Sequence, residues 1–152
     1  MNAPYAIEDV IPHRGRMRLV DTILIVEADL AVTQATVRPD WPLMTPDGVH
    51  PIILIELAAQ TAAVSSGRSH APESDGEQRP AGGWLVGIKR ADFSIDCIPV
   101  DACITIRSQN RIAVDQYREI SAVASIGDRP IGEVHFQVLQ AGKTQFSDLT
   151  PT

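Results

Sequence analysis

The stretch from residue 51 to residue 64 is apolar on nearly every side of the helix that it would form, yet it contains the acidic residue Glu56. A helix without a polar face has to be buried around its whole circumference. The stretch is also too short and too interrupted to span a bilayer, which takes about 20 apolar residues. The rest of the chain must therefore supply a surface that wraps around this helix, and a carboxylate inside it is costly unless it has a partner or a task.

Most of the other patterned segments read as β-strands. The expected strands are residues 18–26, with both faces covered, and then 31–38, 84–95, 102–109, 116–126 and 131–140. A short helix is expected over 4–11, and the proline-rich segment 39–48 is expected to be a loop that leads into the long helix.

About six strands and one long helix indicate an α+β architecture in which a single antiparallel sheet curls around the helix. This is the hotdog fold, and such a sheet commonly pairs edge to edge with a second copy. The length of 152 residues predicts one domain, residues 1–152. The polar segment 65–83 is expected to be a flexible loop, and residues 142–152 a loosely ordered tail.

Charge and cysteine content exclude several classes of protein. The net charge of −6 and the lack of a dense basic stripe argue against nucleic acid as a partner. The first residues show no basic and apolar secretory signal, so we expect a cytoplasmic protein without a membrane span. Cys97 and Cys103 match no metal-binding spacing, and no metal is expected.

The beginning of the helix is the predicted binding site for the substrate. Gly48 and Pro51 mark the start of the helix, and its first N–H groups and positive dipole end favour an anion or a developing oxyanion. Gly48, Val49 and Pro51 are therefore predicted to border the substrate.

Glu56 and Gln60 lie four residues apart, on one face of the helix. At this spacing they can hydrogen-bond to each other or to a shared ligand, so Gln60 is a second predicted substrate contact. Desolvation is expected to raise the pKa of Glu56 towards neutrality, as a general acid or base requires. The alternative is a buried glutamate that has only a structural role.

Three blocks of the sequence resemble the β-hydroxyacyl-acyl-carrier-protein dehydratases. They are 11-IPHRGRMRLVDTI-23, 52-IILIELAAQTAA-63 and 84-WLVGIKRADFSIDCIPVDACITI-106. The resemblance implies a homodimer, or a higher hotdog oligomer, that acts on acyl thioesters carried on the phosphopantetheine of acyl carrier protein or coenzyme A. It implies no other cofactor. In that family a histidine of one subunit takes the α-proton and a carboxylic acid on the helix of the other assists departure of the β-hydroxyl, and Glu56 stands at the acid's position.

The histidine of that family does not carry over. It is expected before a Phe-Pro pair in the loop that precedes the helix, where this chain has Asp40 before Trp41 and Pro42. His50 and Asp40 are the two candidates to replace it, and each can equally be an ordinary loop residue. His13 lies in the structural Pro-His-Arg element of the resemblance and is expected to be structural.

Three functions remain open from the sequence. The first is a 3-hydroxyacyl-thioester dehydratase, a hydro-lyase of fatty-acid or polyketide-type synthesis. The second is a hotdog thioesterase with the helix carboxylate as base or nucleophile. The third is a non-catalytic, acyl-binding subunit. The basic cluster of His13, Arg14, Arg16 and Arg18, with Lys89 and Arg90, either docks an acidic carrier protein or is a solvated surface.

Overall fold

A computed structural model describes residues 6–11, 13–69 and 83–140 of the chain. The helices are α1 (Ile7–Val10), a 3₁₀ turn (Gly15–Met17) and α2 (Ile53–Ser69). The strands are β1 (Thr22–Val26), β2 (Leu30–Thr36), β3 (Met44–Thr45), β4 (Gly48–Val49), β5 (Gly83–Phe93), β6 (Cys103–Val114), β7 (Tyr117–Ile126) and β8 (Arg129–Gln140). No helix in these three ranges is long and apolar enough to cross a membrane.

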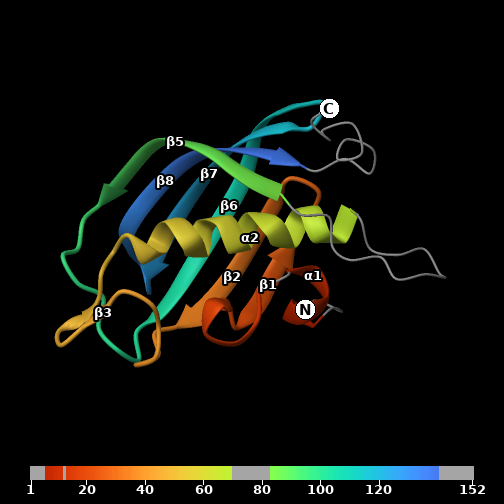
Figure 1. Cartoon of the computed structure of the whole chain (residues 1–152). Coiled ribbons are helices and arrows are strands. Elements are labelled where there is room, and N and C mark those ends of the chain that lie inside the picture. The colour runs from red at the N-terminus through yellow and green to blue at the C-terminus, as the bar shows by residue number, and fades with distance from the viewer. Residues whose placement is uncertain (1–5, 12, 70–82, 141–152) are drawn as a thin grey trace, which may run out of the picture.

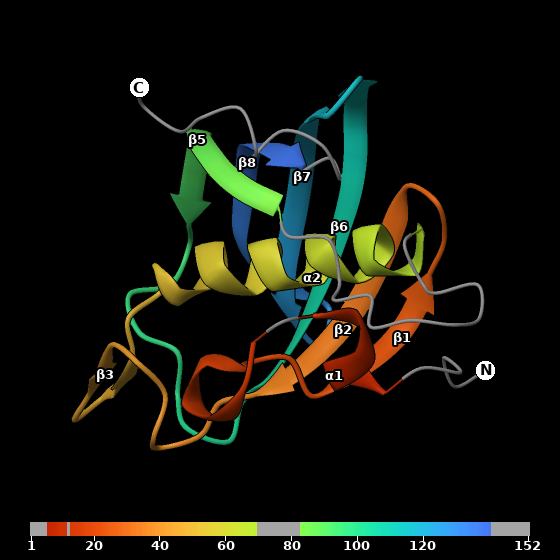
Figure 2. The ribbon, with the colours of Figure 1, turned by 45° about the vertical axis from the view of Figure 1, so that its right-hand side comes forward.

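Six of the strands form one antiparallel sheet in the order β1-β2-β6-β7-β8-β5. Figures 1 and 2 show this sheet curving around α2, while α1 and the 3₁₀ turn lie on the side of β1 and β2. The short strands β3 and β4 form a separate hairpin just before α2. The predicted hotdog architecture, an α+β fold with one sheet curled around one helix, is confirmed.

The core lies between α2 and the inner face of the sheet. On β8, Val134 and Phe136 are buried, whereas Glu133 on the alternate side is exposed, as the period of two predicts. From the helix, Leu54 and Leu57 are almost fully buried in the same cluster. Alternation along the strands therefore fixes which face of the sheet meets the helix.

Several predicted boundaries differ from the structure; the strand expected over 102–109, for example, continues to Val114. The strand expected over 18–26 is regular only from Thr22 to Val26, and it is an edge strand. Its side chains Leu24 and Ile25 are exposed, so the expectation that both faces are covered was wrong. The long helix continues to Ser69, so residues 65–69 of the expected flexible loop are helical. Residues 70–82 of that loop and the tail 142–152 lie outside the described residues.

The sheet covers only one side of α2 within a single chain. Ile52 is 44% exposed, and Ile55 and Ala59, which follow it at helical spacing, are half-buried. At the far edge of the sheet, four large apolar side chains of β5 are also exposed: Trp84, Leu85, Val86 and Ile88. The apolar character of the helix therefore exceeds what the described residues of one chain bury.

Candidate active site

Glu56 lies in the first turn of α2 and has two side-chain partners among the described residues. The Nε2 atom of Gln60 donates a hydrogen bond of 3.0 Å to its Oε1 atom. The Nε2 atom of His13 lies 3.2 Å from the same oxygen. The side chains of His13 and Glu56 are 29% and 37% exposed, so the pair is open to solvent on one side. The carboxylate is thus held between two side chains and still accessible.

Gln60 joins the helix to the segment before β1. Its side-chain oxygen accepts hydrogen bonds from the backbone N–H groups of Leu19, at 3.0 Å, and Val20, at 3.4 Å. Its amide nitrogen donates to Glu56 and, at 2.7 Å, to the carbonyl oxygen of Met17. Gln60 is fully buried and all of its hydrogen-bonding capacity is used inside the chain. The predicted contact between Gln60 and Glu56 is present. The amide of Gln60 has no free hydrogen-bond donor or acceptor for a substrate.

His13 is placed by the turn between α1 and the 3₁₀ helix. The guanidinium of Arg14 donates hydrogen bonds to the carbonyl oxygens of Glu8, Ile11 and His13, and so ties this turn to α1. The Nδ1 atom of His13 is buried and has no hydrogen-bond partner among the described residues. The Nε2 atom is therefore the ring nitrogen that faces the carboxylate.

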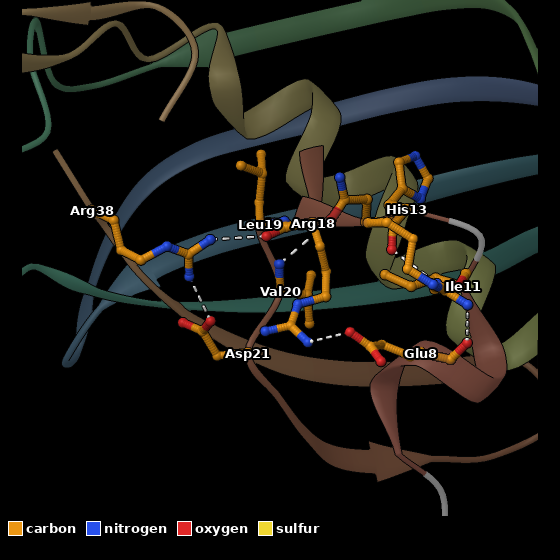
Figure 3. A network of polar contacts seen from close by, with 10 residues as sticks. Glu8, Ile11, His13, Arg18, Leu19, Val20, Asp21 and Arg38 are labelled. Carbon is orange, nitrogen blue, oxygen red and sulfur yellow. Dashed lines mark hydrogen bonds and ion pairs between the residues drawn. The ribbon is translucent and has the colours of Figure 1, made fainter. Parts of the chain in front are cut away.

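A second group of contacts supports this segment. Figure 3 shows Arg38 reaching the carboxylate of Asp21, at 2.7 Å, and the carbonyl oxygen of Arg18, at 2.9 Å. Arg18 in turn pairs with Glu8 of the α1 segment, at 3.1 Å. These pairs connect α1, the segment before β1 and the end of β2, so residues 13–21 are held against the sheet from several directions.

The pKa of Glu56 is lowered, which is opposite to the expectation from the sequence. The hydrogen bond from His13 is the largest cause and favours the charged carboxylate. Burial acts in the expected direction and raises the pKa, but the hydrogen bond from Gln60 and the charge of His13 add to the lowering. The expectation of a raised pKa was wrong because the sequence did not show that two donors meet at this carboxylate.

The two residues expected to replace the missing histidine have polar partners other than Glu56. His50 is exposed and its Nδ1 atom accepts the N–H of Ile52 at 3.1 Å, so the ring caps the start of the helix. Asp40 is exposed, its carboxylate lies 3.7 Å from Arg38, and its carbonyl oxygen accepts a bond from Arg16. Among the described residues, neither shares a hydrogen bond or ion pair with Glu56.

The predicted substrate contacts at the helix start have their backbone groups engaged. Val49 exchanges two backbone hydrogen bonds with Ile98, of 2.9 and 3.0 Å, and the carbonyl oxygen of Gly48 accepts one from Thr45. Pro51 is buried and its carbonyl oxygen accepts the N–H of Leu54. A thioester oxygen bound here would have to replace existing hydrogen bonds, such as the one between His50 and Ile52.

Chemically, the site offers a carboxylate and an imidazole in contact, beside the partly exposed apolar residues Ile52, Ile55 and Ala59. The described residues contain no group of three or more His, Cys, Asp or Glu side chains that could hold a metal ion. The sequence reasoning treated His13 as structural and missed its contact with Glu56. The only signal for it was that both residues lie in blocks of the same family resemblance.

Comparison with known proteins agrees with this fold. The model of the ApeP-like family, described as ApeP dehydratase, matches residues 5–146 of the chain. No curated protein sequence matches significantly.

Many solved structures are similar to this chain, and three of them follow. The dehydratase heterocomplex ApeI:P from Xenorhabdus doucetiae contains a chain with a TM-score of 0.83 and 18% identity, covering 97% of this chain and 98% of that one. An HP0420 homologue from Helicobacter felis has a TM-score of 0.64, 10% identity and coverages of 86% and 95%. A hypothetical thioesterase with coenzyme A from Streptococcus pneumoniae TIGR4 has a TM-score of 0.62, 12% identity and coverages of 79% and 84%. At these identities the likeness concerns the fold.

Proposed function

The chain belongs to the ApeP-like dehydratase family, and from this premise we propose that it removes water from 3-hydroxyacyl thioesters. In this reaction a base in the site takes the C2 proton, and the electron pair of the C2–H bond forms the C2=C3 double bond. The C3–O bond breaks at the same time, and the oxygen leaves as water with a proton from Glu56. The acyl group is carried on the phosphopantetheine of acyl carrier protein or coenzyme A, within the cytoplasm.

The observation that carries this proposal is the placement of Glu56. It is the acidic residue of α2, it lies in the first turn, and its side chain is partly exposed although the helix is otherwise apolar. The neighbouring side chains Ile52, which is exposed, and Ile55, which is half-buried, give an acyl chain an apolar surface beside the carboxylate. A carboxyl group at a fixed position, next to an apolar surface, is placed where it can exchange a proton with a thioester-bound chain.

The test is turnover of a panel of 3-hydroxyacyl thioesters, on acyl carrier protein and on coenzyme A, followed by the absorbance of the enoyl thioester. Glu56→Gln keeps the shape of the side chain and removes its proton transfer, so we expect kcat to fall by about 10²–10⁴-fold. Glu119→Gln, at a carboxylate of β7 that pairs with Lys89 of β5, is the matched control and should keep activity. Equal activity of Glu56→Gln and the wild type would refute the assignment.

Thioester hydrolysis is the second candidate function. The lowered pKa of Glu56 favours it, because an ionised carboxylate is the form that acts as a base or nucleophile on a thioester. The same panel distinguishes the two reactions: hydrolysis releases a free thiol, whereas dehydration leaves the thioester intact and forms the enoyl product. Binding of acyl thioesters without either product would instead indicate a non-catalytic subunit.

We further infer that the chain works as a homodimer, paired through β5. This strand is an edge of the sheet, and its side chains Leu85, Val86 and Ile88 are exposed and apolar. Such an edge can pair with a strand of another chain, because no charged side chain at these three positions opposes it. The similar ApeI:P structure is a heterocomplex, so pairing with a related chain is the alternative. Light scattering of the purified chain, with Val86→Lys as the variant expected to become monomeric, tests the homodimer.

A further inference from the structure

We propose that His13 of the same chain is the proton-transfer partner of Glu56, so that one protomer supplies both groups. This inference rests on the proposed dehydration and names the second catalytic residue of that site. It differs from the expectation for the family, in which the histidine comes from the loop before the helix of the other subunit. In this chain that loop position is Asp40, which lies beside Arg38 instead.

The geometry carries the proposal in three ways. The Nε2 atom of His13 is 3.2 Å from Oε1 of Glu56, which is within reach of direct proton exchange. The Nδ1 atom is buried without a partner among the described residues, so Nε2 is the nitrogen that remains reachable at the open side. Both side chains are partly exposed, so a substrate can approach the pair.

The pair is held in place by contacts that do not need a second subunit. Gln60 donates a hydrogen bond to Glu56 and accepts hydrogen bonds from the N–H groups of Leu19 and Val20. It therefore fixes the distance between α2 and the segment before β1. Arg14 fixes the turn that carries His13. Catalytic groups held by several hydrogen bonds of this kind keep their geometry between turnovers.

The proposed step is balanced in protons. The pair holds one proton before the reaction, and exclusion of water by the bound substrate favours the neutral arrangement, a carboxylic acid beside a neutral imidazole. The imidazole takes the proton from C2 while the carboxylic acid gives its proton to the departing hydroxyl. The pair again holds one proton afterwards, and the products are the enoyl thioester and water.

His13→Gln is the variant that separates chemistry from structure. The amide nitrogen of glutamine can take the place of Nε2 and keep the hydrogen bond to Glu56, but it cannot exchange a proton. We expect kcat to fall by about 10²–10⁴-fold with KM little changed. The double variant with Glu56→Gln should be no worse than the single variants, because the two groups act as a unit. His135→Gln, in a second exposed His–Glu pair on β8, is the matched control.

Mixing two inactive variants tests whether the pair lies within one chain. When Glu56→Gln and His13→Gln subunits with different tags are unfolded together and refolded, half of the dimers are mixed, and native mass spectrometry verifies this. If the groups of one site came from two chains, each mixed dimer would have one intact site, and about a quarter of wild-type activity would return. We expect no recovery, and recovery to that level would overturn the proposal.

The remaining outcomes separate this inference from the proposed function. If Glu56→Gln is inactive but His13→Gln keeps wild-type kcat, His13 is a structural partner and the dehydratase assignment stands. If His13→Gln fails to fold, the test is His13→Ala with added imidazole. Recovery of turnover by free imidazole supports the proton-transfer role, and lack of recovery by a folded His13→Ala protein overturns it. If the Glu56 and His13 variants both dehydrate the substrate at the wild-type rate, the inference and the proposed site are both wrong.

Discussion

Gln60 provides the sharpest test of how the segment before β1 is attached to the central helix. Replacing it with leucine keeps a side chain of similar size on α2 and removes all four of its hydrogen bonds. The backbone N–H groups of Leu19 and Val20 then have no acceptor, in a part of the core where both residues are buried. Met17 is 51% exposed, so its carbonyl oxygen can turn to water instead.

The expected loss follows from these contacts. A buried N–H left without a partner costs about 1–3 kcal/mol. The bond to Leu19 is 3.0 Å long and should cost the full amount, whereas the 3.4 Å bond to Val20 is weaker and should cost less. Together we expect Gln60→Leu to lower the free energy of unfolding by about 2–5 kcal/mol. For a domain of this size that is a fall in Tm of about 5–15 °C.

Urea unfolding of the wild type, Gln60→Leu and Thr61→Val measures this effect. Thr61 is the neighbouring buried polar residue and is bonded to Thr33, at 2.8 Å, and to the carbonyl oxygen of Leu57. Its loss leaves only one hydroxyl without a side-chain partner and should cost about 1 kcal/mol. If Gln60→Leu costs no more than Thr61→Val, Gln60 does not attach the segment to the helix in the way described.

Two further predictions concern the helix start and the pH dependence of stability. Gly48 has a φ of +138°, and a Cβ atom there would overlap the carbonyl oxygen of Ile98, so Gly48→Ala should cost about 3 kcal/mol or more in urea unfolding. Gly127→Ala, at a φ of +57° with open space around it, should cost only about 1–2 kcal/mol, and equal losses would contradict this explanation. The lowered pKa of Glu56 means that its carboxylate stabilises the fold above the unfolded pKa of about 4.3 and that this contribution is lost as the pH falls through the folded value. Because the side chain is 37% exposed, the contribution should stay below about 1 kcal/mol. Unfolding of the wild type and Glu56→Gln, followed from about pH 7 down to about pH 3, should converge at the acidic end, and a difference that grows as the pH falls would contradict it.

The contrast between β1 and β8 shows which strand properties local sequence can predict. Alternation along β8 predicted which side chains are buried, because side-chain direction in a strand has a period of two whatever the sheet contains. The apolar run at β1 predicted a strand covered on both faces, and the structure has an edge strand there. A run of apolar residues does not show where in the sheet order its strand will lie. The exposure of its side chains therefore could not be predicted from the local sequence.

By itself, the sequence determined the architecture and half of the candidate site. A helix without a polar face requires a sheet that wraps around it, and a spacing of four residues brings Glu56 and Gln60 together on any helix. Only the tertiary structure brought His13 to Glu56, and with it the direction of the carboxyl's pKa. The direction of the shift depends on which donors reach the carboxylate oxygen of Glu56. His13 is brought there by the long-range contacts of Gln60 and by the turn that Arg14 holds, and no local sequence pattern encodes these contacts.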